Sequence, residues 1–223
     1  MLKNLFIHNW WAILYFNFKM LPFKQAIKLP FDFYGNVRFV NLNGKVIFNT
    51  NRLRKGMIKI GSQGRDMFPL NPVILDIRGK LELNGFFYIG CGSTIRVESD
   101  ARLIIGNKSR IGANSIVFCE DKITIGENVG FSWNCQLMDT DRHEVQDVIT
   151  GTVFPSRAPI EIGNNVWVGN HVCFNKGCHV PDNTIVASCS LCNKNYLNVA
   201  PFSILGGIPA KVIGSNKSRI WEH

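Results

Sequence analysis

An apolar residue recurs at every sixth position in the last third of this chain of 223 residues. Apolar residues recur at three- and four-residue spacings in an amphipathic helix and at two-residue spacing in a half-buried strand, so neither element alone explains the period. The period is typical of a solenoid in which six residues supply one strand and one corner, and three such groups complete a triangular coil. We therefore expect a parallel β-helix. The repeated positions are Ile162, Val168, Phe174, Val180, Val186 and Cys192.

A second set of residues lies four positions after the first, and all but the last are small or β-branched. We expect this set to fit the tight corners of the coil and the first set to fill its interior. Since three groups make one coil, residues 18 apart should stack, as Ile162 on Val180 and Val168 on Val186. Stacked coils bury one continuous core. The second set is Val166, Val172, Cys178, Thr184, Ser190 and Tyr196.

The earlier half of the chain, from about Phe33 to Ile105, shows the period less regularly. Its mark is a short β-rich run that ends in glycine, the residue that best tolerates a tight bend. We interpret this half as imperfect coils of the same solenoid, with helical structure confined to the two ends of the chain. Along the whole chain, such runs end at Gly61, Gly90, Gly106, Gly126 and Gly163.

A polar stretch interrupts the period. Ile125, Phe131 and Leu137 keep the six-residue spacing and predict the next interior residue at position 143, but the next clear interior position is Ile162. The chain therefore carries 162 − 143 = 19 extra residues. A solenoid can extrude a loop without loss to its core, and long loops in compact domains are usually functional or disordered. We predict an excursion loop at 139–159.

This loop begins with Asp139-Thr-Asp141-Arg-His143. A carboxylate beside a histidine can hydrogen-bond one ring nitrogen, fix the tautomer and raise the basicity of the other nitrogen. His143 is therefore a candidate general base, with Asp139 and Asp141 as candidate catalytic partners. The alternative is a solvated loop in which the aspartates only shape a turn.

Charge and cysteine content narrow the class of protein. The chain has 25 basic and 16 acidic residues, a net charge of +9, and the basic residues are dispersed, so we expect no nucleic-acid partner. The seven cysteines follow no secretion signal, which indicates a reducing, cytoplasmic compartment. Cys189 and Cys192 have metal-like spacing without a second ligand pair, and we interpret them as core residues and expect no metal.

The two ends of the chain depart from the period. Residues 1–32 are dense in aromatics and lysines, with an apolar run too short to span a bilayer. They form either a cap on the solenoid or a segment that lies on an anionic membrane, at the inner face of the cell membrane. We expect the β-helix domain at 33–204 and a closing segment at 205–223, in which Pro209 sets a turn.

The stretches 160–194 (IEIGNNVWVGNHVCFNKGCHVPDNTIVASCSLCNK) and 204–214 (ILGGIPAKVIG) resemble the hexapeptide-repeat acyltransferases. The similarity is to the branch of galactoside and maltose acetyltransferases and polysaccharide O-acetyltransferases. It implies an all-β, left-handed parallel β-helix, acetyl-CoA as acyl donor, and a homotrimer with active sites between subunits. It also implies a sugar acceptor, and the basic, aromatic N-terminus favours a cell-surface polysaccharide or its lipid-linked precursor.

The resemblance also implies roles for particular residues. The family's loop histidine lies 24 residues before the tryptophan of its V-W-[IV]-G segment, as His143 lies before Trp167. His143 would take the proton from the acceptor hydroxyl, and the backbone N–H near Asn170 would stabilise the oxyanion. Where the family has Gly-Ala and Thr-Lys, this chain has Ala187-Ser188 and Asn193-Lys194. The implied acetyl-CoA contacts are Trp167, Gly169, Ser188, Lys194 and Lys211.

Three alternatives stay open at this point. In the first alternative, the enzyme acetylates a free small sugar, an amino sugar or an antibiotic. In the second alternative, the chain is a γ-class carbonic anhydrase-like metal enzyme that uses His143, His171 and His179, although the close histidine pair of that class is absent. The third alternative is a non-catalytic β-helix scaffold, which needs neither a loop histidine nor the V-W-V-G segment.

Overall fold

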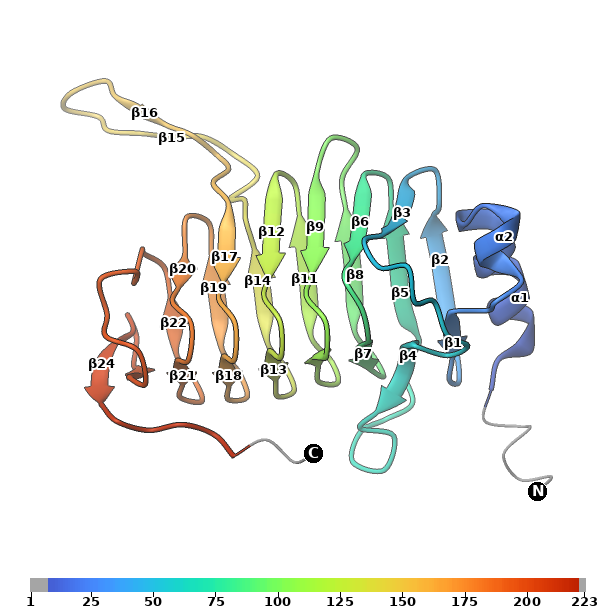
Figure 1. Cartoon of the computed structure of the whole chain (residues 1–223). Helices are drawn as coiled ribbons and strands as arrows, with labels where there is room; N and C mark the ends of the chain where they lie inside the picture. Colours follow the sequence, from blue (N-terminus) through green and yellow to red (C-terminus); the bar gives the residue numbers. More distant parts are fainter. Residues whose placement is uncertain (1–7, 221–223) are drawn as a thin grey trace.

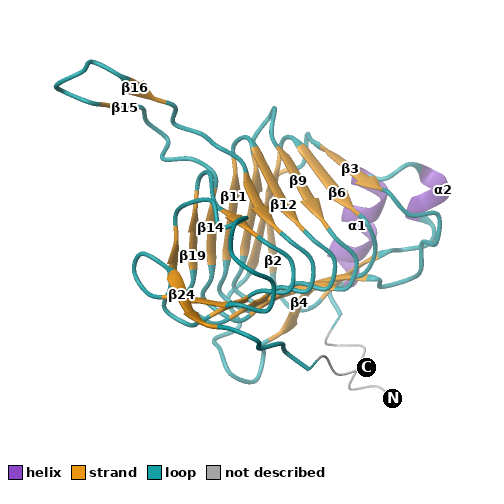
Figure 2. Ribbon diagram, turned by 60° about the vertical axis from the view of Figure 1, so that its left-hand side comes forward, coloured by secondary structure: helices purple, strands orange, loops and turns teal. Residues whose placement is uncertain are grey.

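The computed structural model describes residues 8–220, which form an all-β, left-handed parallel β-helix with three long sheets as its faces (Figures 1 and 2). The nine-stranded sheet contains β1 (Phe31–Phe33), β4 (Ile58–Gln63), β7 (Phe87–Gly90), β10 (Ser109–Ile111), β13 (Gly130–Phe131), β18 (Trp167–Val168), β21 (Ile185–Val186), β23 (Ile204–Gly206) and β24 (Lys211–Gly214). The seven-stranded sheet contains β2 (Val37–Asn41), β5 (Val73–Ile77), β8 (Thr94–Val97), β11 (Ile116–Cys119), β14 (Gln136–Met138), β19 (Cys173–Asn175) and β22 (Leu191–Cys192). The six-stranded sheet contains β3 (Lys45–Phe48), β6 (Lys80–Leu83), β9 (Arg102–Ile105), β12 (Lys122–Ile125), β17 (Ile160–Ile162) and β20 (His179–Val180).

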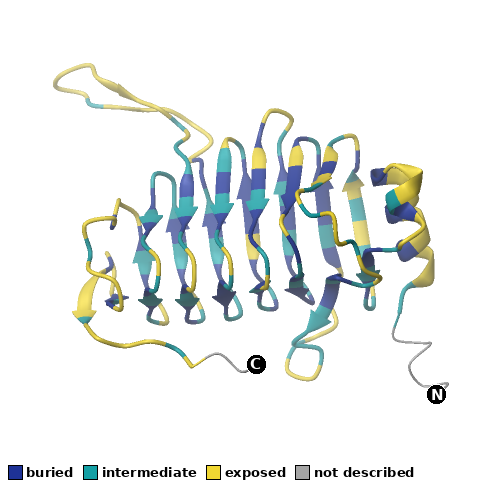
Figure 3. Cartoon of the chain, viewed as in Figure 1, coloured by how far each residue is buried: buried dark blue, intermediate teal, exposed yellow. Residues whose placement is uncertain are grey.

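The stacking expected from the six-residue period is confirmed. Ile162 pairs with Val180, Val168 with Val186, and the next interior pair along the chain follows the same 18-residue register. Both residue sets, the interior positions and those four residues later, are buried. Figure 3 shows buried residues recurring in coil after coil along the prism. The core is therefore one continuous column.

The small residues four positions after each interior residue were expected to sit at the tight corners. At most corners the sharp bend is instead made by the residue just before the small one. That residue has a positive φ, and at several corners it is asparagine, such as Asn165 and Asn183, whose short side chain tolerates this conformation. The side-chain amide of Asn128 donates to Asn165 at 3.0 Å, and that of Asn165 donates to Asn183 at 3.2 Å. These side chains form a ladder that ties adjacent coils together at one corner.

The earlier coils are larger than the later ones, as their weaker period predicts. Ile105 pairs with Ile125, a separation of 125 − 105 = 20 residues, and Ile60 pairs with Ile89, a separation of 29. The excess over 18 in the first pair comes from an eight-residue step between Val117 and Ile125. In that coil the extra residues widen the corner between the seven- and six-stranded sheets, whereas in the 29-residue coil most of the excess lies at 64–72, between β4 and β5.

The N-terminal residues that the structure describes cover one end of the prism. Helix α1 (Trp10–Met20) buries Phe16 against the rings of Phe31 and Phe33, and the short α2 (Phe23–Ala26) follows it. The buried amide of Asn17 donates to the carbonyl oxygen of Phe31 and accepts from its N–H. These are the backbone hydrogen bonds that a further strand would otherwise make with β1. No described helix has the length and apolar character needed to cross a membrane. The expectation that 1–7 take part lies outside the described residues.

The other end is closed by β24, which pairs antiparallel with β23 after the turn at Pro209. Parallel pairing of β23 with β21 carries the coil to Gly206, two residues beyond the expected boundary. The helices of the described chain lie at the N-terminal end alone. The C-terminal segment after β24 runs back beneath the strands of the nine-stranded sheet (Figure 1).

Candidate active site

The excursion loop leaves one corner of the prism, and the expected acetyl-CoA residues lie mainly elsewhere. The loop follows β14 of the seven-stranded sheet and precedes β17 of the six-stranded sheet, with β15 (Val145–Gln146) and β16 (Val153–Phe154) paired antiparallel near its tip. We call this edge the loop corner; it consists of residues 78–79, 98–101, 120–121, 139–159, 176–178 and 193–194. Register confirms the 19-residue insertion, because Ile125 pairs with Ile162, 37 residues on, and 37 − 18 = 19.

Asp139 anchors the start of the loop in the core of the corner. Its side chain is fully buried and its carboxylate accepts hydrogen bonds from the backbone N–H groups of Glu120 and Asp121, at 2.7 and 2.9 Å. Burial raises the pKa of this carboxyl above its usual value, and the two N–H groups oppose that shift. The Asp139 carbonyl oxygen also accepts from the N–H of Ala158, which joins the two ends of the loop.

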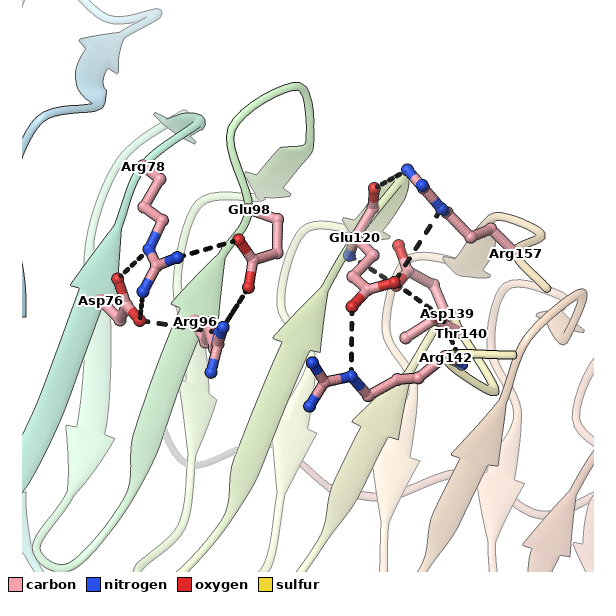
Figure 4. Close-up of polar contacts among 9 residues, drawn as sticks. All are labelled: Asp76, Arg78, Arg96, Glu98, Glu120, Asp139, Thr140, Arg142 and Arg157. Carbon is pink, nitrogen blue, oxygen red and sulfur yellow. Dashed lines mark hydrogen bonds and ion pairs between the residues drawn. The ribbon is translucent and has the colours of Figure 1, made fainter. Parts of the chain in front are cut away.

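Glu120 holds both strands of the loop neck (Figure 4). Its carboxylate accepts a 2.8 Å hydrogen bond from Thr140 and lies 3.6 Å from Nε of Arg142 and 3.9 Å from Nε of Arg157. Its backbone carbonyl oxygen accepts a further bond from Arg157 at 3.2 Å. Thr140 and Arg157 also form a β-bridge. Glu120 therefore contacts both strands of the neck where the loop leaves the prism.

Lys176 holds the other side of the neck. Its ammonium group lies 2.6 Å from the carboxylate of Asp141 and donates to the carbonyl oxygen of Pro155 at 2.7 Å. The N–H of Asp141 donates to the carbonyl oxygen of Ser156. Because Lys176 belongs to the next coil, the loop is tied to the coils on both sides of it.

His143 lies just beyond this neck, exposed to solvent. The structure differs here from the expected carboxylate–imidazole pair, because Asp139 is turned into the corner and Asp141 pairs with Lys176. Within residues 8–220 no hydrogen bond to the His143 ring is found, so in one chain the two aspartates shape the neck and leave the ring accessible.

Trp167 lies on the nine-stranded sheet, across the prism from the loop corner. Its ring is half-buried, and the guanidinium carbon of Arg219 lies 3.7 Å from its centre. The N–H of Lys217 donates to the carbonyl oxygen of Phe202, which holds the C-terminal segment in this position. The outer face of Trp167 is thus covered by the segment that follows β24.

Gly169, Asn170 and Ser188 form a compact group at the corner between the nine- and seven-stranded sheets. A Cβ at Gly169 would lie 2.6 Å from the backbone N of Ser188, so only glycine allows these coils to stack. The hydroxyl of Ser188 donates to the side-chain oxygen of Asn170 at 2.6 Å. The backbone N–H of Asn170 has no acceptor among the described residues and is available to an external oxygen.

The two lysines expected to meet acetyl-CoA lie apart from one another. Lys194 is on the loop corner, with its ammonium group 5.6 Å from the centre of the Tyr196 ring. Lys211 begins β24, at the end of the nine-stranded sheet, and is exposed. One chain therefore divides the predicted site residues between two sides of the prism. His143, Asp139, Asp141 and Lys194 lie on the loop corner, and Trp167, Gly169, Asn170, Ser188 and Lys211 lie on or beside the nine-stranded sheet.

The cysteines and histidines form no metal centre in the described part of the chain, where no group of three His, Cys, Asp or Glu side chains could hold an ion. Cys192 is buried and Cys189 is exposed, so the pair does not face one site. Burial raises the pKa of the Cys135 thiol to about 11, because it disfavours the thiolate.

Three residues of the site were not found from the sequence: Glu120, Lys176 and Arg219. Glu120 had a signal, the eight-residue step from Val117 to Ile125, which marks the widened corner. Lys176 and Arg219 had none, since an isolated basic residue in a repeat or a terminal segment is usually solvated.

The chain matches no protein-family model. It is 31% identical to the galactoside O-acetyltransferase of Escherichia coli over 55% of this chain, and it spans 61% of that relative. It is 29% identical to an uncharacterised 24.8 kDa protein in the cps region of Klebsiella pneumoniae, over 92% of this chain and 87% of that one. The polySia-specific acetyltransferase NeuO superposes with a TM-score of 0.63 at 22% identity, over 87% of this chain and 79% of that one.

The β-helix fold and the six-residue register are those expected from these similarities. The chain is similar in sequence to hexapeptide-repeat acetyltransferases and shares the left-handed β-helix fold. In this chain the loop corner carries His143 and the nine-stranded sheet carries the V-W-V-G segment.

Proposed function

We propose that this protein is an acyl-CoA-dependent O-acetyltransferase, which transfers acetyl from acetyl-CoA to a hydroxyl of a sugar. One observation carries the proposal: an exposed histidine stands on a loop whose neck is held by side chains from the coils on both sides. A solenoid that served only as a scaffold would have no use for a loop whose neck is fixed so firmly beside an exposed imidazole. The galactoside O-acetyltransferase relative supports a sugar as acceptor.

His143 is the proposed general base. A sugar hydroxyl is a poor nucleophile at neutral pH, and a neutral imidazole with a pKa of about 6.5 is suited to remove its proton. The acceptor oxygen bonds to the thioester carbonyl carbon, and the oxyanion that forms accepts from the N–H of Asn170. Collapse breaks the carbon–sulfur bond, and the proton on His143 passes to the coenzyme A thiolate. The transfer is direct, without an acyl-enzyme.

The proposed assembly is a homotrimer with active sites between subunits. His143 lies on the loop corner and Trp167 on the opposite face, so one copy does not bring them together. A neighbouring copy with its nine-stranded sheet against the loop corner would place the two residues on one cleft. Trp167 and Ser188 would then line the acetyl-CoA side, with Lys194 and Lys211 close to the phosphates.

The proposed place of action is the cytoplasm, at the inner face of the membrane, on a cell-surface polysaccharide or its lipid-linked precursor. Helix α1 and its continuation turn an apolar face outward, beside Lys19, Lys24 and Lys28. Such a face with nearby lysines suits the boundary of an anionic bilayer. The exposed apolar residues are Trp10, Trp11, Leu14, Tyr15, Phe18, Phe23 and Ile27.

The testing experiment incubates the purified protein with acetyl-CoA and a panel of acceptors, which includes polysaccharide fragments, free sugars, amino sugars and an antibiotic. Mass spectrometry should detect one added acetyl group per modified hydroxyl on a polysaccharide fragment, with matching release of coenzyme A. Acetylation of free sugars or of the antibiotic alone would assign the smaller substrates. No transfer to any acceptor, with no binding of acetyl-CoA, would remove the enzyme proposal.

A further inference from the structure

Four arginines form a row along the seven-stranded sheet, close to the loop corner, and the row ends at the loop neck (Figure 4). Arg78 follows β5, Arg96 belongs to β8, and Arg142 and Arg157 belong to the two strands of the neck. The proposed acetyl transfer gives this row no role. Figure 4 shows that the arginines are interleaved with Asp76, Glu98 and Glu120. The charge that the row presents to solvent therefore depends on how deeply each group is buried.

The acidic and basic groups of the row lie at different depths. The side chains of Asp76, Glu98 and Glu120 are 4%, 21% and 14% exposed. Those of the arginines are more exposed, at 35% for Arg78 and 32% for Arg96, and at 60% and 56% for Arg142 and Arg157. The carboxylates form a floor and the guanidinium groups an outer layer. The surface that meets solvent is therefore mainly cationic, with the exposed Asp100 at its rim.

The floor holds the arginines in fixed positions. Arg78 makes two hydrogen bonds to Asp76, at 2.9 and 3.0 Å, and Arg96 pairs with both Glu98 and Asp76. Each guanidinium has five N–H donors, so these contacts leave donors for a ligand. A guanidinium that is already oriented loses little conformational freedom when it binds a carboxylate.

Phe118 joins the two halves of the row. The guanidinium carbons of Arg96 and Arg142 lie 5.1 and 5.4 Å from the centre of its ring. Arg96 is on β8, Phe118 on the neighbouring β11, and Arg142 follows β14, so the row crosses successive coils. Coils in paired sheets are about 4.8 Å apart, which gives the row from β5 to β14 a length of about 14 Å. It is a track along the prism, and His143 immediately follows its last member on the first strand of the neck.

We propose that this row is an acceptor subsite for an acidic glycan, one that carries carboxylates along its chain. The inference rests on the proposed transferase function and names its substrate class. Guanidinium groups spaced along a track match carboxylates spaced along a polymer, and each pair makes charge-assisted, often bidentate hydrogen bonds. The glycan lies along the prism with one hydroxyl at His143. The phosphates of acetyl-CoA have similar chemistry, and the experiment separates the two ligands.

The experiment compares Arg96→Gln with Arg102→Gln by steady-state kinetics. Arg102 is the matched control, because it pairs with Glu82 at 2.9 Å on the six-stranded sheet, away from the row. Arg96→Gln leaves Asp76 paired with Arg78, so the floor keeps a partner. Acceptors are oligogalacturonate and sialic acid oligomers, each beside its carboxyl-reduced form. Arg78→Gln, at a row position outside the loop neck, is a second variant that leaves Asp76 beside Arg96, and thermal melting confirms that each variant is folded.

Arg96→Gln and Arg78→Gln should each raise the KM for the acidic acceptor about tenfold, the usual scale of one lost charge-assisted contact. The KM for acetyl-CoA, and turnover of the reduced acceptor, should match the Arg102→Gln variant. Wild type should prefer the acidic form to its reduced form. A rise in the KM for acetyl-CoA instead would assign the row to the donor phosphates and overturn the proposal. An equal preference for both forms would overturn it too.

A binding measurement keeps the inference separate from the catalytic proposal. Fluorescence polarisation of a labelled oligogalacturonate reports on the row whether or not acetyl is transferred. Binding that is lost in Arg96→Gln and kept in Arg102→Gln supports the subsite, even if no transfer is found and the transferase proposal fails. Transfer to neutral acceptors with oligogalacturonate binding unchanged in both variants rejects the subsite and leaves the transferase proposal standing.

Discussion

The coils from Ile160 to Gly206 and the loop at 139–159 are neighbours in the chain but are held by different forces. In the coils, Phe174 and its equivalents stack in a fully buried column, and strands such as β18 and β19 each pair with two others. The loop beyond its neck buries almost nothing, and its position depends on Glu120, Asp139 and Lys176. Apolar stacking therefore decides whether the protein folds, and a few polar contacts decide where His143 stands.

The largest effect should come from the loop. General-base catalysis typically contributes about 10²–10⁴-fold, so His143→Ala should lower turnover by that factor and leave acetyl-CoA affinity nearly unchanged. His171→Asn is the control, since His171 occupies a positive-φ corner that asparagine tolerates. Steady-state kinetics at saturating acetyl-CoA measures both. Turnover of His143→Ala within threefold of wild type would remove this residue from the mechanism.

The second prediction tests the coils against the loop directly with one substitution at two places. Phe174→Ala should lower the free energy of unfolding by about 3–5 kcal/mol, because it empties a fully buried position beside Phe131. Phe154→Ala, at a side chain 48% exposed on the loop, should change it by less than about 0.5 kcal/mol. Urea denaturation followed by circular dichroism gives both values. Equal losses would mean that the loop is part of the folding core.

The third prediction concerns the neck. Glu120→Gln removes the charge that Arg142 and Arg157 share, and the loop should shift enough to lower turnover about ten- to hundredfold, since small misplacements of catalytic groups are costly. The KM for acetyl-CoA should stay within twofold. Glu82→Gln, which breaks a similar ion pair with Arg102 on another face, is the control. A loss of stability without a loss of turnover would make Glu120 purely structural.

The smallest effect should come from Arg219. Its guanidinium covers the outer face of Trp167, and a cation–π contact at a partly exposed site is worth about 0.5–1 kcal/mol. If pantetheine uses that face, Arg219→Ala should lower the KM for acetyl-CoA roughly two- to fivefold, whereas Trp167→Ala should raise it. Isothermal titration calorimetry with coenzyme A should give the same ranking of affinity, with Arg219→Ala above wild type and Trp167→Ala below it. Weaker binding of coenzyme A by Arg219→Ala would mean that Arg219 contacts the coenzyme instead of covering Trp167.

The sequence predicted the coils well because their period is a direct imprint of the stacking. Ile162, Val168 and their equivalents must fill the interior, so spacing alone located the strands, their register and the length of the insertion. The corners were predicted less well. The bend depends on the backbone of residues such as Asn165 and Asn183, which carry no apolar signal.

The site could be predicted only where a residue breaks the period or matches a motif. His143 stands out because it lies in the insertion, and Trp167 because it belongs to V-W-V-G. The partners of Asp139 and Asp141 could not be predicted, because Glu120 and Lys176 are distant in sequence and meet the loop only after the coils stack. Side-chain pairing across coils depends on three-dimensional neighbours, and one sequence does not show them.

The two closed ends of the prism bear on how such a protein can change in length. An open sheet edge is a template for another chain, and here α1 with Asn17 covers the first strand at one end, while at the other end the chain reverses into the short antiparallel β24, which ends the parallel stack. Protection against filament growth thus resides in the ends and not in any coil. A coil can be gained or lost between them in whole turns, without exposing a new edge. The length of the prism, and with it the length of any polymer that lies along it, is therefore free to vary among descendants of one ancestor.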